Sequence, residues 1–378
     1  MHYESTLYDE LMELIHAPDS PFYIVEHQME GVTFRVFNYR LASYSDFLKP
    51  SALEARGIMF EMEDGRMKRL ASLPPRKFFN FKENPLVMDI DFSKADIVMD
   101  KMDGSIMTTY MIHGNTYLKS KTSLASEQAN AAMEFLFNGE NDRLLKYLEY
   151  MEQAKFSVSL EWTSPVHRIV LPYQEDKLTV LHVRDRDDGK VLAYNEVVMT
   201  MVSFDPLVLD YLVKSYKVDD VPAFVDSIPA KTGVEGYIIG VEGVLTKHKT
   251  DWYCSLHNLK DDINSPKKRF IVVVNEGHDD ARANFSYDEY MLKLIDEMEL
   301  KVKAIYRNID KYVVGFYNSN SDLERKDYAI AGQKELDRLY FSLAMNLYLG
   351  KENDYKTWMI KHYKEFGIGD DPELTETE

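Results

Sequence analysis

Hydrophobic and polar residues alternate along several segments in the first two-thirds of the chain, which is the pattern of β-strands with one buried face. Strands are predicted at residues 33–39 (TFRVFNY), 56–62, 106–112, 115–121, 155–162, 177–184 and in a hairpin over 235–249. Apolar residues recur at helical spacing over 126–137, where Ser126 is suited to cap the first turn, and a second helix is predicted near 141–153. This mixture predicts an α+β domain with substantial antiparallel sheet.

The pattern changes beyond about residue 262, where apolar residues recur at steps of three and four. Helices are predicted at 288–316, at 325–349 with Gly350 as the terminating residue, and at 354–366. The sequence therefore predicts an α+β domain over 1–261, an all-α domain over 262–368 and an acidic, disordered tail over 369–378.

The composition is that of a globular protein that is not a general polyanion binder. Of the 378 residues, 45% are apolar and 29% are charged, and the formal net charge is −18. Affinity for a phosphate backbone normally comes from a basic surface. Residues 66–82 nevertheless hold basic side chains and no acidic one, which leaves room for a local phosphate site.

Membrane and disulfide-rich classes are not indicated. No apolar run approaches the roughly 20 residues that a membrane span needs, and the N-terminal residues lack a signal-peptide pattern. The single cysteine, Cys254, excludes an internal disulfide and a thiolate zinc cluster. We therefore expect a cytosolic enzyme without structural metal.

The segment DKMDGSI at residues 100–106 allows two interpretations. Asp103-Gly104 is a turn dipeptide, because glycine tolerates positive φ and aspartate bonds its own backbone, so the segment is suited to a hairpin corner. Alternatively, Lys101 is a nucleophile and Asp103 shares its face, because residues i and i+2 of a strand point the same way. The motif alone does not decide between the two.

Further charged residues follow this motif in a fixed order. The series along the chain is Arg56, Lys77, Lys101-x-Asp103-Gly104, Lys119-x-Lys121, Glu161, Glu235-Gly236 and Lys247-x-Lys249. Taken singly, each Lys-x-Lys pair is typical of a solvated strand face, and Glu161 of an ordinary surface or paired acid. The combined order is what points to a single site.

This series resembles the nucleotidyltransferase motifs of covalent ligases and capping enzymes, and it is most similar to the RNA ligase 1 family of tailed bacteriophages. The resemblance covers about residues 33 to 280 and is carried by ASYSDFLKPSALEARGIMFEM, KFFNFKENP, KMDGS, KSK, RIVLPYQ, EGY and KTDWYCSLH. Ile106 stands where DNA ligases and capping enzymes usually have arginine, as in the RNA ligase branch. Met102 departs from the glutamate that is frequent in the family, at a position expected to face away from the reacting phosphate.

The resemblance implies an adenylylation (nucleotidyltransferase) domain that uses ATP and Mg²⁺ to join RNA ends. Lys101 would attack the α-phosphorus of ATP to give a lysyl-AMP. The AMP would then move to an RNA 5′-phosphate and be displaced by a 3′-hydroxyl. A lysine ammonium with a pKa of about 10.4 is no nucleophile, so nearby cations and burial must lower that pKa.

The resemblance assigns cationic residues to the triphosphate. Lys247 and Lys249 are suited to the α-phosphate and to lowering the pKa of the nucleophile. Arg56 and Lys77 are suited to the β- and γ-phosphates, which leave as pyrophosphate. Tyr39 would belong to the same ATP pocket.

The resemblance assigns the carboxylates to the ribose and the metal. Glu161 is expected to hold a ribose hydroxyl, whereas Asp103 and Glu235 are expected to bind metal-bound water. The other functional residues implied are Gly104, Lys119, Lys121, Gly236 and Tyr253. Asp279 matches a metal-binding position of the family, although its sequence context is equally suited to a helix N-cap, and Tyr253 is equally suited to a core.

Two alternatives stand beside the ligase interpretation. A GTP-dependent capping-type guanylyltransferase uses the same covalent chemistry without joining strands, and Ile106 argues against it. A non-catalytic RNA-binding relic predicts loss of Lys101 or of the paired lysines, and all are present. The family resemblance implies nicked tRNA with 5′-phosphate and 3′-hydroxyl ends as the partner, recognised by the helical third. It also implies a monomer, without membrane attachment, in the cytoplasm of an infected bacterial host.

Overall fold

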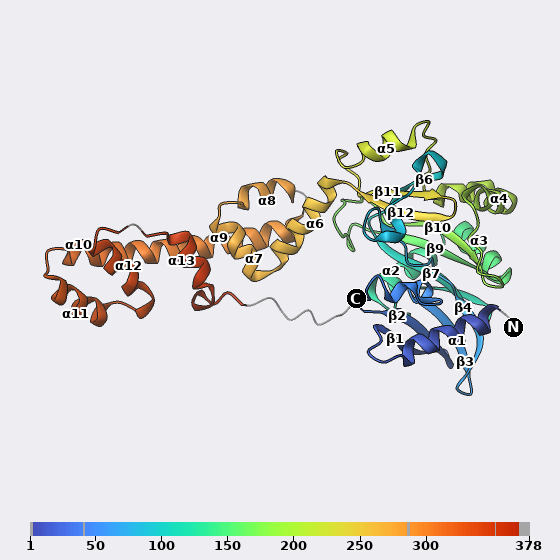
Figure 1. Cartoon of the computed structure of the whole chain (residues 1–378), viewed down its shortest axis with the longest axis horizontal. Helices are drawn as coiled ribbons and strands as arrows, with labels where there is room; N and C mark the ends of the chain where they lie inside the picture. Colours follow the sequence, from blue (N-terminus) through green and yellow to red (C-terminus); the bar gives the residue numbers. More distant parts are fainter. Residues whose placement is uncertain (1–2, 41, 286–287, 352, 370–378) are drawn as a thin grey trace. The chain divides into compact units, whose positions relative to one another are not determined.

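The computed structural model describes residues 3–40, 42–285, 288–351 and 353–369. The chain forms two compact units, Met1–Cys254 and Ser255–Glu378 (Figure 1). The domain boundary predicted after residue 261 falls inside helix α6 (Asp251–Asn264) and stays a prediction. The predicted acidic tail lies, beyond Gly369, outside the described residues.

Three four-stranded sheets form the first unit, and they confirm the predicted α+β class. The sheet orders are β1-β2-β3-β4, β10-β9-β7-β8 and β5-β12-β11-β6, here named the first, central and third sheets. Adjacent strands run antiparallel except β12 and β5, which pair in parallel. The strands are β1 (Phe22–Met29), β2 (Val32–Tyr39), β3 (Ile58–Glu63), β4 (Arg66–Ser72), β5 (Phe79–Asn80), β6 (Ala95–Lys101), β7 (Ser105–Ile112), β8 (Asn115–Lys119), β9 (Phe156–Thr163), β10 (Lys177–Asp185), β11 (Gly236–Val241) and β12 (Val244–Lys249).

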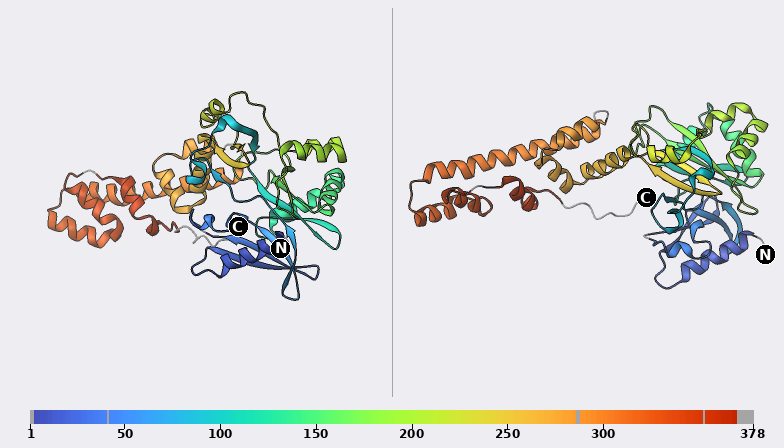
Figure 2. Two further views of the ribbon diagram at one scale, coloured as in Figure 1. Left: turned by 45° about the vertical axis from the view of Figure 1, so that its right-hand side comes forward. Right: turned by 45° about the horizontal axis from the view of Figure 1, so that its top comes forward.

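Helices cover the sheets of this unit and bury their apolar faces against them. The helices are α1 (Tyr3–His16), α2 (Glu127–Leu136), α3 (Asp142–Gln153), α4 (Tyr194–Phe204) and α5 (Val221–Ser227). Leu7, Leu11 and Leu14 of α1 pack on the first sheet, and Figure 2 shows this helix lying along it. Helices α2, α3 and α4 share a core with the central sheet that includes Tyr147 and the fully buried Trp162.

The connection at residues 102–104 is not the hairpin corner that its sequence allows. Strand β6 belongs to the third sheet, whereas β7 belongs to the central sheet, so the DG turn carries the chain from one sheet to the other. Strand β6 ends at Lys101. The predicted shared strand face of Lys101 and Asp103 is therefore wrong, because Asp103 lies beyond the end of the strand.

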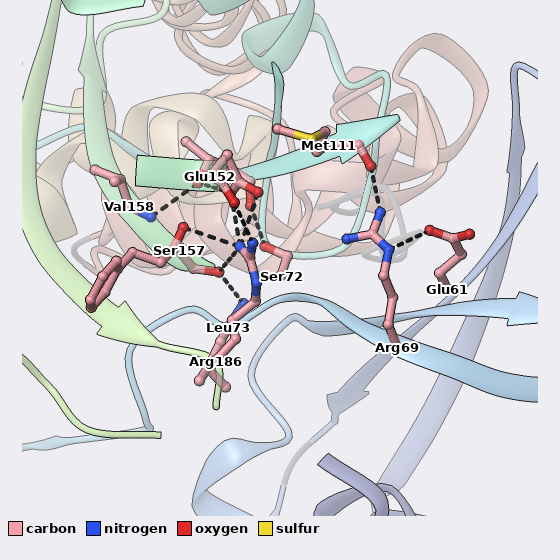
Figure 3. Close-up of polar contacts among 11 residues, drawn as sticks. Glu61, Arg69, Ser72, Leu73, Met111, Glu152, Ser157, Val158 and Arg186 are labelled. Atoms are coloured by element: carbon pink, nitrogen blue, oxygen red, sulfur yellow. Dashed lines mark hydrogen bonds and ion pairs between the residues drawn. The ribbon is translucent and has the colours of Figure 1, made fainter. Parts of the chain in front are cut away.

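A buried polar network joins the first and central sheets (Figure 3). The Arg186 guanidinium donates to the Glu152 carboxylate and to Ser157 Oγ, both at 3.1 Å. Ser157 Oγ in turn accepts from the backbone N–H of Leu73 at 2.9 Å. At the other end of the same interface, Arg69 donates to the carbonyl of Met111 at 2.7 Å. The buried Arg186 guanidinium is thus paired with a carboxylate and further protein acceptors, as the cost of desolvation requires.

The second unit is helical, as predicted for the C-terminal third. Its helices are the end of α6, then α7 (Pro266–Val274), α8 (His278–Asn284), α9 (Glu289–Ile309), a π-helical turn (Asp310–Val314), α10 (Gly315–Asn320), α11 (Arg325–Glu335), α12 (Arg338–Tyr348) and α13 (Tyr355–Lys361). The apolar stripe of α9 is buried, with Ile295, Val302 and Ile305 inward. No helix among the described residues is long and apolar enough to cross a membrane.

The single helix predicted over 325–349 is wrong, because the structure divides it into α11 and α12. Leu336 leaves the helical region with φ −100° and ψ 144°. The Asp337 carboxylate then accepts the backbone N–H of Leu339 at 2.8 Å and begins the next helix. Apolar periodicity continues across this break, which is why the pattern alone did not show it.

The N-cap of α2 gives a test of the central core. Ser126 Oγ accepts the backbone N–H of Ala129 at 3.2 Å, as its sequence position predicts. We expect Ser126→Ala to lower the free energy of unfolding by about 1 kcal/mol, measured by urea titration, because the first turn loses its acceptor. Ser126→Asn keeps an acceptor and should leave the stability unchanged; equal losses in both variants would contradict the capping role.

Candidate active site

The register of three strands brings the predicted nucleophile into contact with two other motifs. Gly236 of β11 pairs with Lys101 of β6 on one side and with Lys249 of β12 on the other. Glu235 precedes this glycine, and its Oε1 lies 2.6 Å from Lys101 Nζ and 3.3 Å from Lys249 Nζ. A Cβ at Gly236 would overlap the backbone carbonyl of His248. Only glycine therefore permits this close approach of the strands.

A pocket beside Lys101 is lined by both charged and apolar side chains. Its lining residues are Arg56, Pro75, Phe78, Met99, Asp100, Lys101, Met102, Gly104, Ile106, Glu161, Leu181, His182, Val213, Ile238 and Lys247. Within the described part of the chain, the Arg56 and Lys247 side chains form no ion pair with a carboxylate. Two cations without counter-ions in one pocket are suited to a polyanionic ligand.

Burial and neighbouring cations act on Lys247. Burial, together with the positive charges of Arg56, Lys77 and Lys101, lowers the pKa of Lys247 to about 7. The Lys247 ammonium also lies 4.8 Å from the centre of the Phe78 ring. At pH 7 a lysine with this pKa is only partly protonated. A bound anion favours the charged form, so the ammonium becomes fully protonated when an anion binds.

Lys77 and Tyr39 lie together, but neither lines the pocket beside Lys101. The Lys77 ammonium lies 5.8 Å from the centre of the Tyr39 ring and 5.2 Å from that of Phe79. Its charge still acts on Lys247. The structure thus places the Tyr39 ring next to the Lys77 ammonium. Lys77 in turn is close enough for its charge to act on Lys247 of the pocket.

Glu161 faces the turn that follows the nucleophile. Its Oε1 accepts the backbone N–H of Gly104 at 3.0 Å, and β7 and β9 pair residue 106 with residue 161. Burial raises the pKa of Glu161 to about 7; the nearby Glu235 charge acts in the same direction, and Lys101 and Arg56 oppose it. A Cβ at Gly104 would overlap the carbonyl of Trp162, so the turn requires glycine here.

Asp103 fixes a loop that sequence reasoning did not place. Its Oδ2 accepts the backbone N–H groups of Val170 and Leu171 at 2.8 and 2.6 Å, and its Oδ1 accepts Tyr253 Oη–H at 2.7 Å. The backbone N–H of Asp103 donates to Tyr173 Oη at 3.0 Å. Both carboxylate oxygens are therefore occupied by protein donors. The RIVLPYQ stretch matched the family in sequence, yet only the fold shows that it is tied to the KMDGS turn.

The Lys119 side chain is buried, within electrostatic range of Arg56. Its ammonium donates to the carbonyl of Ser120 at 3.1 Å, and burial together with the Arg56 charge lowers its pKa to about 7. Strand β8 ends at Lys119, so the strand face predicted for Lys119 and Lys121 is wrong. The carbonyl of Lys121 instead packs against Gly57, next to Arg56. The face predicted for Lys247 and Lys249 is confirmed, because both lie within β12.

The carboxylates fit a hydrated metal ion rather than a closed metal cage. Among the described residues, no group of three or more His, Cys, Asp or Glu side chains is arranged to hold a metal. Glu235 Oε2 is buried and has no hydrogen-bond partner in the described part of the chain. One or two carboxylates plus substrate phosphates are the usual ligands of Mg²⁺, and Glu235 and Glu161 could supply them.

Asp279 lies in the second unit. Its side chain is 83% exposed and pairs with Arg282 at 3.3 Å. The metal-binding role taken from the resemblance stays a prediction.

His182 is a pocket residue that sequence reasoning missed. Burial lowers the pKa of His182 to about 4, and Arg56 and Arg184 act in the same direction, so the imidazole is neutral at pH 7. The alternation in KLTVLHVR predicted its strand, but not which face of the strand meets a cavity. That information depends on the pairing of β10 with β9.

The raised pKa of Glu161 predicts a pH-dependent stability. Between pH 4.5 and pH 7 the folded protein holds this proton more strongly than the unfolded chain, so the contribution of Glu161 to stability falls as the pH rises. Glu161→Gln removes the titration. We expect the variant to gain on the order of 3 kcal/mol over the wild type by pH 8, and nothing near pH 4. Parallel pH–stability curves in urea unfolding would contradict the shift.

Comparison with known proteins agrees with this geometry. A family model described as RNA ligase matches residues 54–257, and one described as T4 RNA ligase 1, C-terminal domain, matches residues 260–366. A putative RNA ligase of Thermovibrio ammonificans is 27% identical over 65% of this chain and 64% of its own length. RNA ligase 1 of bacteriophage TS2126 is 30% identical over 54% of this chain and 52% of its own length.

Both alignments thus span less than two-thirds of the relatives' length. The solved structure of an archaeal ATP-dependent RNA ligase is 12% identical over 94% of each chain, with a TM-score of 0.47. The RNA ligase model spans more than half of the chain, including Lys101, Glu161, Glu235 and both lysines of β12. The chain therefore belongs to the RNA ligase family.

Proposed function

We propose that this protein is an ATP-dependent RNA ligase that joins 5′-phosphate and 3′-hydroxyl ends through a lysyl-AMP and an RNA-adenylate. The observation that carries the proposal is the position of the Lys101 ammonium, 2.6 Å from Glu235 and next to a pocket whose Arg56 and Lys247 have no carboxylate partner among the described residues. Covalent adenylate transfer needs such an amine beside sites for phosphate.

To act as a nucleophile, the Lys101 ammonium must lose one proton. Its Nζ must also lie in line with the α-phosphorus of ATP and the pyrophosphate that leaves. The Glu235 carboxylate is placed to accept or stabilise that proton, and Lys249 shares the same oxygen. Attack by Nζ forms a P–N bond as the bond to pyrophosphate breaks. Arg56, Lys77 and Lys247 offset the charge on the phosphates, so that catalysis rests on positioning and charge neutralisation.

The later steps use the same site. The oxygen of the RNA 5′-phosphate displaces the lysine from the adenylate, and the 3′-hydroxyl then displaces AMP to form the phosphodiester. Glu161, anchored by Gly104, is placed to hold a ribose hydroxyl of the nucleotide. A bound Mg²⁺ would supply charge neutralisation at the phosphates, and Glu235, whose Oε2 has no hydrogen-bond partner in the described part of the chain, would be a carboxylate to hold it.

Mass spectrometry after incubation with ATP and Mg²⁺ tests the nucleophile. We expect an AMP adduct on Lys101, which Lys101→Ala abolishes because Lys101 both lies 2.6 Å from Glu235 Oε1 and lines the pocket, whereas Lys249, 3.3 Å from the same oxygen, is not among the pocket-lining residues. Lys155→Ala, which removes an exposed lysine paired with Asp187, is the matched control and should keep the adduct. An adduct mapped to another residue, or none, defeats the proposal.

Parallel reactions with GTP address the capping alternative, which no finding supports. We expect label from α-labelled ATP and not from GTP. Label from GTP alone would replace the ligase proposal with that of a guanylyltransferase.

The natural substrate we propose is tRNA cut in the anticodon loop, bound by a monomer in the cytoplasm of an infected bacterial host. The match of residues 260–366 to the C-terminal domain of an RNA ligase 1 supports a separate recognition role for the helical unit. Ending the chain after Asn264 keeps α6 and the Tyr253–Asp103 bond.

We expect this truncation to lower the sealing of nicked tRNA at least tenfold relative to short linear RNA, while adenylylation by ATP stays within about threefold of the full chain. Gel assays of both reactions measure the difference. Equal losses in a truncated protein that remains folded, judged by circular dichroism, would contradict a recognition role.

A further inference from the structure

Two short segments of the first unit carry the cations that we assign to the outer phosphates. Arg56 follows Leu53 and Glu54, and Lys77 follows Pro74 after two residues. The segments are directly bonded, since the backbone N–H of Lys77 donates to the carbonyl of Leu53 at 2.7 Å. The positions of the two cations are thus mechanically linked through backbone, not through their own side chains.

Arg184 of β10 forms hydrogen bonds with both segments, through Glu54 of one and Pro74 of the other. Its guanidinium makes a two-pronged contact with the Glu54 carboxylate, at 2.7 and 3.0 Å, and donates to the carbonyl of Pro74 at 2.8 Å. The remaining donors reach the carbonyl of Gly189, at 2.9 and 3.3 Å. Arg184 is 1% exposed, and its guanidinium donates to protein acceptors rather than to solvent. A planar fork with five donors is the side chain that this geometry requires.

Glu54 is charged although it is 5% exposed. Burial by itself would raise its pKa, but Arg184 and Arg76 outweigh burial and hold the pKa of Glu54 below its usual value. A buried ion pair of this kind adds little net stability relative to packed apolar residues. Its place on the segment that carries Arg56 is therefore better explained by positioning than by stability.

We infer that the Glu54–Arg184 pair is a positioning device that sets Arg56 and Lys77 at the spacing of the β- and γ-phosphates of ATP. The inference rests on the proposed function and deepens it, because it concerns how the same pocket distinguishes a triphosphate from a monophosphate. Displacement of either segment by about 1 Å would weaken contacts to the outer phosphates. Contacts to adenosine and the α-phosphate, which involve other strands, would remain.

The chain offers a matched control two residues further along, just beyond the end of β10. Arg186 forms a second buried pair, with Glu152 at 3.1 Å, and donates to the carbonyl of Phe156 at 3.1 Å (Figure 3). It is 7% exposed and makes no contact with the segments at 53–56 and 74–77 among its described hydrogen bonds. Loss of its fork should therefore destabilise the protein without selecting between nucleotides.

Equilibrium binding of ATP and AMP, in the full-length chain with Lys101→Ala to prevent reaction, tests the inference. With Mg²⁺ present, we expect Arg184→Lys to weaken ATP binding at least tenfold and AMP binding by no more than twofold. Lysine keeps the charge but cannot bridge Glu54 and Pro74 at once. Arg186→Lys should change the affinity for neither nucleotide by more than twofold, even where both variants lower the melting temperature.

The possible outcomes separate the inference from the function beneath it. Equal weakening of ATP and AMP by Arg184→Lys, or the same selective loss with Arg186→Lys, overturns the positioning role. Glu54→Gln keeps the acceptor shape and serves if Arg184→Lys does not fold; no selective loss of ATP binding in it also overturns the role. A parent protein that binds ATP no better than AMP would instead count against the proposed function.

Discussion

The contact of Glu235 with two lysines is the interaction on which the rest of this site depends. It exists because β11 lies between β6 and β12, and because Gly236 leaves no side chain at the point where their backbones are closest. One carboxylate between two ammonium groups holds the Lys101 side chain in place. The second oxygen of this carboxylate, Oε2, has no hydrogen-bond partner in the described part of the chain. It is therefore available to a further donor or to a cation.

The cations in the pocket repel one another as long as no anionic ligand is bound. Arg56 and Lys247 have no counter-ion among the described residues, and Lys119 is buried behind them with a pKa lowered to about 7. Like charges at short range repel, so the protein must hold these segments by other means. The backbone bond between Lys77 and Leu53 and the closed Glu54–Arg184 pair do so, and a ligand with several negative charges would relieve the repulsion.

The sequence predicted the local elements far better than their contacts. The strand at 33–39, the capped helix after Ser126 and the β11–β12 hairpin are confirmed, because each follows from spacing within a few residues. The Lys101–Glu235 contact joins residues far apart in the chain and depends on strand register, which no local pattern contains. The same is true of the pairing between Glu54 and Arg184. Glu54 lies in a stretch that resembles the family and Arg184 ends a predicted strand, but no local pattern shows that the two meet.

The KMDGS segment shows how a local turn can be predicted correctly while its place in the fold is misread. Its glycine and aspartate do form a tight connection, as turn chemistry predicts, but that connection passes between sheets and releases Asp103 from the strand face of Lys101. Asp103 then binds Val170, Leu171 and Tyr253 through both oxygens. An acid placed this way orders the loop and the start of α6 beside Lys101, while the Oε2 of Glu235 has no hydrogen-bond partner in the described part of the chain and is left to meet a cation.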